Sequence, residues 1–339
     1  MRAAVYYSNR DVRIEERPVP RIGPGEVLLR VEASGICGSD VLEWYRTRRA
    51  PLVLGHEVAG VVEEVGTGVT AFAPGQRIAT THHVPCNACR LCLNGQHSLC
   101  DTLRRTHFDP GGMAEFVRLP AENVERGTFL VPEGVDAVAA SFVEPLACAV
   151  RAQRVAGVGP GRSVAVLGSG LSGLLQVQLA RALGAAPVVA TDVHPFRREA
   201  AARVGADLVV DAREDVPAAV REATGGQGAD AVLVCTGAPA ALAQGFRCVA
   251  RGGAVLLFAL LPPGEVHPVP LGDLWQEGVT VTSSYAGPPA DMRVALDLIA
   301  TGRVDVLATV THRLPLEQAA EGFRLTAEAG ASLKVILLP

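Results

Sequence analysis

The chain changes its pattern of hydrophobic and polar positions near residue 160. Up to about residue 145, short apolar runs such as EVLLRVEAS and EVAGVVEEVG are separated by glycine, proline and other turn residues. Short apolar runs bounded by turn residues are typical of β-strands. The first ~145 residues are therefore predicted to form an irregular, mostly β domain.

Beyond residue 160, strand-like runs alternate with helical ones. They are, in order, SVAVLG, LSGLLQVQLARALGA, PVVATD, FRREAAARVGA, DLVVDA, VPAAVREATGG, ADAVLVCTG, PAALAQGFRCVARGG, AVLLFAL and GVTVTSSY. This alternation predicts a parallel sheet with helices on both faces. Six strands are expected, which is the number in a complete dinucleotide-binding Rossmann fold. The expected class is α/β.

The C-terminal tail combines helical and strand-like runs. Helix-like DMRVALDLIATG and LEQAAEGFRLTAEAG alternate with VLATVTHRLP and a last strand, SLKVILLP. These elements could rejoin the first domain, although composition alone does not assign them.

Composition narrows the class of protein. The 339 residues suffice for two domains, and 49% hydrophobic with 19% charged residues suits a soluble globular protein. A net charge of −4 argues against partners such as nucleic acid or anionic membrane. The start, MRAAVYYSNRDVRIEERP, lacks the apolar run of a signal peptide, and no stretch reaches the ~20 apolar residues of a membrane helix. We therefore expect a cytoplasmic protein. The chain has a single lysine, Lys334, and we interpret this scarcity of lysine as a coding bias.

Half of the eight cysteines lie in CNACRLCLNGQHSLC, residues 86–100. The spacing of Cys86, Cys89, Cys92 and Cys100 allows two disulfides, an iron–sulfur cluster or a closed zinc site. A cytosolic thiol cluster is more often metal-binding or catalytic than a disulfide framework. The apolar surroundings of Cys148, Cys235 and Cys248 predict buried small hydrophobic side chains.

A glycine-rich turn follows the first strand of the alternating region. Gly168, Gly170 and Gly173 form G-x-G-x-x-G, and Leu171 and Ser172 open the helix that follows. The glycines permit a tight turn, close approach of a pyrophosphate and close helix–strand packing. The helix N-terminus offers N–H donors to the phosphates, so a dinucleotide site is predicted.

An acidic residue ends the second strand of that region. Asp192 lies a little over 20 residues past the glycines, where a carboxylate holds the adenosine ribose hydroxyls. It would repel a 2′-phosphate, which favours NAD. Arg197 and Arg198 could accept a phosphate or could line a solvated helix face, so NADP is not excluded.

Three more stretches carry candidate chemistry. They are ASGICGSD with Cys37 and Ser39, GHEVAGVVEEVG with His56 and Glu57, and FVEPLA with Glu144. With the cysteine cluster and the nucleotide fold, they resemble the zinc-dependent medium-chain alcohol dehydrogenases, in the sorbitol, iditol and threonine dehydrogenase branch. The resemblance runs from about Val5 to the C-terminus, and it includes GHE-x2-G-x5-G-x2-V.

The resemblance implies a structural zinc on the four cysteines. Four thiolates close a tetrahedral shell and leave no open position. In a bacterial-type ferredoxin motif, fewer residues separate the last two cysteines and a proline follows the last one. Here seven residues separate Cys92 from Cys100, and Asp101 follows Cys100. His97, inside the lobe, is not needed as a ligand.

The resemblance also implies a second, catalytic zinc. Cys37 and His56 match its ligands, Glu57 matches a position that binds it directly or through water, and Glu144 matches a carboxylate that can bind it. This zinc would act as a Lewis acid toward an alcohol, with hydride passing to the nicotinamide. Ser39 matches the hydroxyl that takes the alcohol proton.

The family arrangement implies a split catalytic domain. Residues 1–145, including the zinc lobe 86–100, and residues 286–339 would form a GroES-like domain around a Rossmann domain at 146–285. The segments that border the nicotinamide match Cys235, Thr236, Gly237, Phe258, Ala259 and Leu260, and more loosely Tyr285. A homo-oligomer is expected, a tetramer or a dimer.

The sequence departs from the branch at three positions. Leu42 replaces a proton-relay histidine, Glu43 replaces a substrate-wall tyrosine, and Ser284 replaces an arginine common in sorbitol dehydrogenases. We expect an NAD(P)-linked secondary alcohol or ketone reaction on a polyol, sugar, amino sugar or cyclitol. The alternatives are a small diol or amino alcohol, such as butanediol or threonine, and a non-catalytic binding protein on the same fold.

Overall fold

The structure, a computed structural model, describes every residue from Met1 to Pro339 and divides into two compact units. The first unit comprises Met1–Cys148, Ala286–Gly302 and Val310–Pro339. The second comprises Ala149–Tyr285 and Arg303–Thr309. The family arrangement implied that residues 286–339 return together to the first domain, whereas residues 303–309 group with the second unit.

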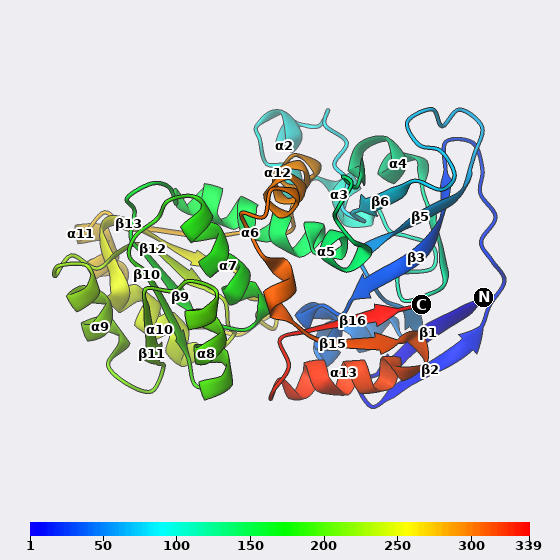
Figure 1. The fold of residues 1–339 in the computed structure, drawn as a ribbon. Coiled ribbons are helices and arrows are strands. Elements are labelled where there is room, and N and C mark those ends of the chain that lie inside the picture. Colours follow the sequence, from blue (N-terminus) through cyan, green and yellow to red (C-terminus); the bar gives the residue numbers. More distant parts are fainter. The chain divides into compact units, whose positions relative to one another are not determined.

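A six-stranded parallel sheet forms the centre of the second unit (Figure 1). Its strand order is β11-β10-β9-β12-β13-β14, and all neighbours run parallel. The strand order reverses between β9 and β12, the switch point at which such folds bind dinucleotides. The strands are β9 (Val164–Leu167), β10 (Val188–Asp192), β11 (Leu208–Asp211), β12 (Ala229–Val234), β13 (Val249–Leu257) and β14 (Thr280–Ser283).

Helices cover this sheet because its central strands are apolar on both faces. Every residue of β9 and β10 is buried, as expected for a parallel sheet between two helical layers. The helices are α7 (Leu171–Ala182), α8 (Pro195–Arg203), α9 (Val216–Ala223), α10 (Pro239–Cys248) and α11 (Leu271–Gln276). Helix α6 (Val143–Ala156) contains the division between the units.

Helix α10 ends earlier than the sequence pattern predicts. The helical run was expected to reach Gly253, but the chain becomes extended at Val249 and pairs with β12. Gly252, with φ +68, allows a backbone conformation within β13 that other residues rarely adopt. Because β13 ends at Leu257, residues 258–260 lie just beyond its carboxyl end.

Two β-sheets form the first unit. Strands β2-β1-β4 make a small sheet, and β15-β16-β3-β5-β6-β8 make a larger one, with β7 also paired to β3. The strands are β1 (Arg2–Ser8), β2 (Asp11–Glu16), β3 (Val27–Gly35), β4 (Leu52–Val53), β5 (Glu57–Val65), β6 (Arg77–Thr80), β7 (Phe116–Leu119), β8 (Thr128–Leu130), β15 (Val310–Pro315) and β16 (Lys334–Leu338).

Most of the C-terminal tail, residues 286–302 and 310–339, belongs to this first unit. Strand β16 runs antiparallel to β3, with Ile336 opposite Gly35. Helix α13 packs its Phe323 against Tyr6 of β1, with ring centroids 5.3 Å apart. The helices here are α1 (Glu43–Arg46), α2 (Arg90–Leu93), α3 (Asp101–Arg105), α4 (Ala121–Gly127), α5 (Ala137–Ser141), α12 (Pro289–Ala300) and α13 (Ala319–Glu328), with 3-10 turns η1 (Gly38–Val41), η2 (Thr47–Arg49), η3 (His97–Leu99), η4 (Val306–Thr309, in the second unit) and η5 (Leu316–Gln318).

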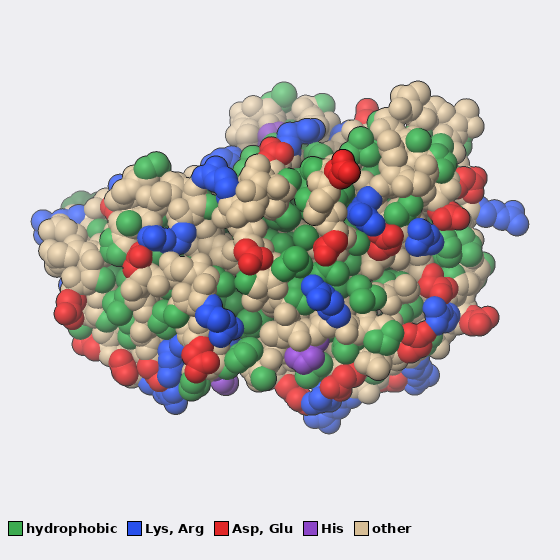
Figure 2. Space-filling model, in the orientation of Figure 1, with side chains coloured by type: hydrophobic (Ala, Val, Ile, Leu, Met, Phe, Trp, Pro, Cys, Tyr) green, Lys and Arg blue, Asp and Glu red, His purple; other side chains and the backbone are tan.

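The predicted fold class is confirmed: a six-stranded Rossmann domain accompanies a mostly β domain. Acidic and basic side chains are interspersed over the face shown in Figure 2, in keeping with the small net charge. No helix is long and apolar enough to span a membrane.

Candidate active site

The four-cysteine lobe brings its thiols together. The sulfurs of Cys86, Cys89, Cys92 and Cys100 all lie within 4.8 Å of one another. The Sγ atoms of Cys89 and Cys92 are 3.6 Å apart, so they are not disulfide-bonded. His97, in η3, is outside this group.

Backbone N–H groups point at two of these sulfurs. Cys89 N donates to Cys86 Sγ at 3.3 Å, and Cys86 N donates to Cys100 Sγ at 3.4 Å. Such bonds favour the thiolate: they lower the pKa of Cys86, and that of Cys100 falls to about 6 although burial opposes the shift. Burial raises the pKa of Cys92 to about 12. The four-sulfur set, held by main-chain donors, fits a closed tetrahedral metal site.

A second donor group lies where β3 ends and β5 begins. Cys37 follows β3, His56 precedes β5, and Glu57 opens β5 opposite Gly35. Their ligand atoms lie within 4.8 Å of one another. The set of one thiol, one imidazole and one carboxylate fits a zinc site that keeps a position open.

Glu57 is paired with the only lysine of the chain. Lys334 Nζ donates to Glu57 Oε2 and to Ile36 O, the latter at 3.0 Å, and both charged side chains are 1% exposed. Gly35 makes the approach possible, because a Cβ there would lie 2.1 Å from Glu57 Oε2. Glu57 Oε1 is buried without a partner. The interpretation of Lys334 as a coding bias therefore overlooked a residue of the site.

Asp40 supports the imidazole of His56. Its fully buried carboxylate lies 3.6 Å from His56 Nδ1 and accepts from Cys37 N at 3.1 Å. Burial alone would lower the pKa of His56, but Asp40 and the Cys37 thiol raise it to about 10. In the absence of metal, the ring is therefore protonated at neutral pH.

Ser39 lies beside this group and is held by Arg46. The Ser39 hydroxyl donates to Cys37 Sγ at 3.4 Å. Arg46 Nη2 donates to Ser39 Oγ at 3.0 Å and to Asp40 Oδ1 at 2.8 Å, and Arg46 Nε donates to Ser39 O at 3.1 Å. Sequence reasoning missed Arg46, because it is one of several arginines in YRTRRA. Leu42 caps α1 with its backbone and offers no side-chain donor or acceptor.

Glu144 forms a third donor group with two histidines that were not predicted. Its ligand atom lies within 4.8 Å of those of His82 and His83, rather than in the group with Cys37. Burial raises the pKa of Glu144 to about 7. Cys148, one turn further along α6, approaches Glu144 Oε1 at 3.6 Å, so it contacts the site and is more than a filler of the core. The adjacent histidines just before the cysteine lobe were the available signal.

The predicted nucleotide residues collect at the carboxyl edge of the parallel sheet. Gly168, with φ +96, follows β9, and Gly170 is the N-cap of α7. A Cβ on Gly173 would lie 1.9 Å from Gly168 O, so only glycine allows this approach. Leu171 and Ser172 form the first turn of α7. The other predicted residues follow the neighbouring strands: Asp192 ends β10, Cys235–Gly237 follow β12, Phe258–Leu260 follow β13 and Tyr285 follows β14.

Asp192 is fixed by the main chain. Ser169 N donates to its Oδ2 and His194 N to its Oδ1, both at 2.9 Å. Arg198 donates a hydrogen bond to Asp192 O at 3.0 Å and forms an ion pair with Asp211. The guanidinium of Arg197 lies next to Gly170, 3.9 Å from where a Cβ would be. The carboxyl end of β10 thus combines an anchored carboxylate with a nearby arginine.

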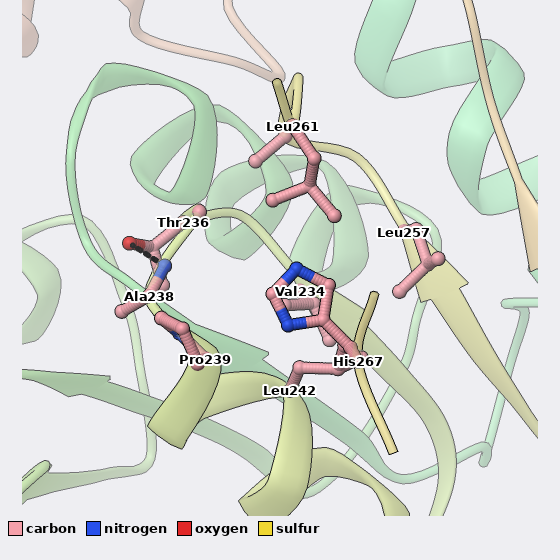
Figure 3. Close-up of a pocket in the computed structure, with 10 residues that line it drawn as sticks. Val234, Thr236, Ala238, Pro239, Leu242, Leu257, Leu261 and His267 are labelled. Atoms are coloured by element: carbon pink, nitrogen blue, oxygen red, sulfur yellow. Dashed lines mark hydrogen bonds between the residues drawn. The ribbon is translucent and has the colours of Figure 1, made fainter. Parts of the chain in front are cut away.

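A small pocket opens at the ends of β12 and β13, and Figure 3 shows the His267 ring within it, among Val234, Leu242 and Leu261. Three residues predicted to border the nicotinamide, Thr236, Gly237 and Ala259, also line it. His267, 3.4 Å from Glu265, was not predicted, since a lone histidine in PPGEVHPVP gives no signal.

The chain combines a dinucleotide-type fold with three metal-type donor groups, which are features of a metal-dependent oxidoreductase. The family model for zinc-binding dehydrogenases matches residues 173–301, and that for alcohol dehydrogenase GroES-like domains matches residues 23–129. An L-threonine 3-dehydrogenase of Bacillus velezensis is 35% identical over 96% of this chain and 95% of its own length. A sorbitol dehydrogenase of Gallus gallus is 34% identical over 99% and 95%.

A solved structure supports the same relationship. A zinc-binding dehydrogenase from Sinorhizobium meliloti 1021 bound to NADP superposes with a TM-score of 0.88 at 32% identity, covering 100% of this chain and 99% of that one. The chain belongs to the zinc-dependent medium-chain alcohol dehydrogenases, in the sorbitol and threonine dehydrogenase branch. It is an alcohol dehydrogenase enzyme, and the resemblance stated from its motifs is confirmed.

Proposed function

We propose that this enzyme transfers hydride between NAD and a secondary alcohol or ketone of a polyol, sugar, amino sugar or cyclitol. The observation that carries the proposal is the approach of Cys37, His56 and Glu57 within 4.8 Å beside Ser39. We assign a structural zinc to Cys86, Cys89, Cys92 and Cys100. We assign a catalytic zinc to Cys37 and His56, with a carboxylate from Glu144 or Glu57.

Ser39 would take the proton of the alcohol. The zinc supplies Lewis acidity toward the alcohol oxygen when it is bound. Ser39 Oγ already accepts from Arg46 and keeps a second lone pair for the alcohol hydrogen. Neither Leu42 nor a guanidinium can accept a proton, so Ser39 would pass it directly to water or to the cofactor ribose.

The charge pairing disfavours a substrate that carries a carboxylate. Lys334 balances Glu57, and Arg46 balances Asp40, so neither basic side chain is left to bind a substrate carboxylate. This favours a polyol or sugar over threonine. Threonine stays the second candidate, since a threonine dehydrogenase is as similar to the chain as the sorbitol dehydrogenase is.

NAD is the proposed cofactor because Asp192 ends β10 with its carboxylate anchored at the glycine-rich turn. A fixed negative charge there repels a 2′-phosphate. Arg197, next to Gly170, would be the residue that admits NADP, the cofactor bound in the Sinorhizobium relative.

A homo-oligomer is proposed from the free edge of the Rossmann sheet. Strand β14 pairs only with β13, and its Val281 is 42% exposed. Nearby in the chain, Val266, Leu271 and Trp275 are 91%, 72% and 82% exposed. Apolar side chains and an open strand edge of this kind support burial against a second copy. A dimer or tetramer would follow.

The cytoplasm is the proposed compartment. All eight cysteines are free thiols, and two of the predicted sites need them reduced. Reduced thiols persist in the cytosol and are oxidised in secreted proteins.

The proposal is tested with a panel of polyols, cyclitols, amino sugars and L-threonine, with NAD and NADP, following absorbance of the reduced cofactor. Cys37→Ala and His56→Ala should abolish turnover, remove one zinc per chain and leave NADH affinity unchanged. Full activity in both variants would contradict the zinc-dependent role of this group.

A further inference from the structure

His82 and His83 are two adjacent histidines that the steps above do not use. Their ligand nitrogens and a carboxylate oxygen of Glu144 all lie within 4.8 Å of one another. The histidines follow β6, whereas Glu144 lies in the first turn of α6, so two separate segments supply the donors. Imidazole and carboxylate are donors that zinc and related transition-metal ions accept. The group is therefore a candidate for a metal site of its own.

The backbone is shaped so that the two histidine rings meet. Neighbouring side chains of an extended strand point to opposite faces, but the chain bends at His82, and the two ring centroids are 3.6 Å apart. Thr81 holds the bend: its Oγ1 accepts from His83 N at 3.1 Å, and its carbonyl oxygen accepts from Asn123 Nδ2 at 2.8 Å. The two imidazoles are thus held together before any ligand binds.

Two members of the group call for a ligand. His82 Nδ1 is buried and forms no hydrogen bond. A buried polar atom without a partner is unfavourable, so in a native protein it indicates a water, an ion or another ligand. Glu144 is only 6% exposed, and a buried carboxylate is stabilised by a cation. A cation between these side chains would satisfy both.

An ion bound here would be distinct from the catalytic zinc. A catalytic zinc uses three protein donors and keeps one position open. Cys37, His56 and Glu57 form a donor group of their own, and Glu57 Oε1 is buried without a partner. That group reaches three donors without Glu144, which leaves Glu144 to the two histidines.

We propose that His82, His83 and Glu144 form a third metal site, which takes an exchangeable divalent transition-metal ion such as Zn²⁺ or Co²⁺. The group contains no thiolate, and a cation in the Cys37–His56 group would repel a second one, so the site should bind more weakly than the two proposed zinc sites.

The third site should regulate the enzyme. The ring centroids of His82 and His56 are 5.0 Å apart, so an ion on His82 would lie beside the proposed catalytic zinc and compete with the substrate for space. Excess zinc should therefore slow turnover. The inference goes beyond the proposed function, which needs one Lewis acid and no second ion.

Cobalt identifies the site because both other proposed metal sites contain cysteine. Co²⁺ bound to a thiolate gives an intense sulfur-to-metal charge-transfer band, whereas Co²⁺ on imidazole and carboxylate gives only weaker visible bands. The wild-type enzyme loaded with its two zincs should bind one further Co²⁺ per chain and show visible bands without charge transfer. Failure to bind this ion, or a charge-transfer band, would overturn the inference.

Histidine variants locate the ion. His82→Phe and His83→Phe each keep a ring in the stack and remove a donor. Cobalt affinity, measured by equilibrium dialysis, should fall by more than the ~10–100-fold that follows loss of a hydrogen bond to a ligand. His107→Phe, at an exposed histidine 6.2 Å from the His82 ring, is the matched control and should keep the wild-type affinity. Unchanged affinity in both stack variants would refute the site, as would loss of one of the two tight zincs.

Inhibition by zinc tests the regulatory role. Zn²⁺ added beyond two ions per chain should lower wild-type turnover, and a weak chelator that leaves the tight zincs in place should restore it. His83→Phe, compared with its own rate without added zinc, should resist this inhibition. Equal inhibition of the two proteins would overturn the regulatory role. A wild-type enzyme inactive on every alcohol with both cofactors would overturn the proposed function, whereas the cobalt spectrum would still decide the third site.

Discussion

Glu57 and Lys334, 277 residues apart in sequence, form a buried ion pair beside the Cys37–His56 group. The C-terminal strand β16 supplies the lysine, and Gly35 of β3 leaves room for it. The pair keeps one carboxylate oxygen of Glu57 occupied, while the other is buried without a partner. The chain thus places its only lysine where it controls the charge of a proposed metal site.

Removing Lys334 should destabilise the first unit strongly. Lys334→Met leaves the Glu57 carboxylate buried without its counter-ion, which costs about 3–5 kcal/mol. We expect a clear fall in melting temperature by calorimetry. The double variant Glu57→Gln with Lys334→Met should recover part of the loss, since no uncompensated charge stays buried. Equal melting temperatures for wild type and Lys334→Met would contradict the pairing.

Arg46 should act through Ser39. Arg46→Met removes the donor to Ser39 Oγ, and kcat should fall by about tenfold, the effect of losing a hydrogen bond to a charged group. In a Ser39→Ala background, the same substitution should have little further effect. Arg48→Met, at a neighbouring exposed arginine, is the control. Equal losses in both backgrounds would instead assign the effect of Arg46 to Asp40.

Zinc affinity at the Cys37–His56 group should rise with pH. Because the pKa of His56 is raised to about 10, zinc must displace a proton from the ring at pH 7. Affinity should therefore increase by up to about tenfold per pH unit below that value. Competition with a chelator at pH 7, 8 and 9 measures this. Asp40→Asn, which removes a cause of the raised pKa, should flatten the dependence, and an identical slope would refute the account.

Cofactor preference should depend on the charge of Asp192. Asp192→Asn removes the charge that repels a 2′-phosphate and keeps one oxygen, which replaces the acceptor of either Ser169 N or His194 N. We expect the NAD/NADP ratio of kcat/KM to fall by about tenfold. Arg197→Met in the same background should reduce use of NADP. A wild-type preference for NADP would show that Arg197 outweighs the carboxylate.

The four-cysteine lobe should contribute stability more than chemistry. Cys92→Ser removes one thiolate from a closed shell, and the binding energy of such a metal is also folding energy. One zinc per chain should be lost and the melting temperature should fall, while kcat per folded chain changes little. Cys248→Ala, at a buried thiol outside the donor groups, should keep its zinc content. A Cys92→Ser protein with full zinc content would contradict the assignment.

Sequence motifs predicted the sites whose residues lie close together in the chain. G-x-G-x-x-G after an apolar run places Gly168 and Gly170 between β9 and α7, and the cysteine spacing predicts one thiol group. Lys334 and Arg46 could not be found in this way. Lys334 acquires its role through the pairing of β16 with β3, and Arg46 through the turn that carries it back to Ser39. The first contact is non-local and the second depends on the path of a short turn, so neither leaves a recognisable spacing in a single sequence.

The position of β16 also sets the order in which the protein can mature on the ribosome. Residues 1–148 emerge first, but their sheet lacks β15 and β16 until residues 310–339 have been translated. The inserted Rossmann sheet has all six strands by residue 283, so it can fold while the earlier segment waits. The counter-ion of Glu57 comes from β16, the last strand of the larger sheet in chain order. A chain interrupted before β16 would therefore contain all six strands of the Rossmann sheet and an incomplete first unit.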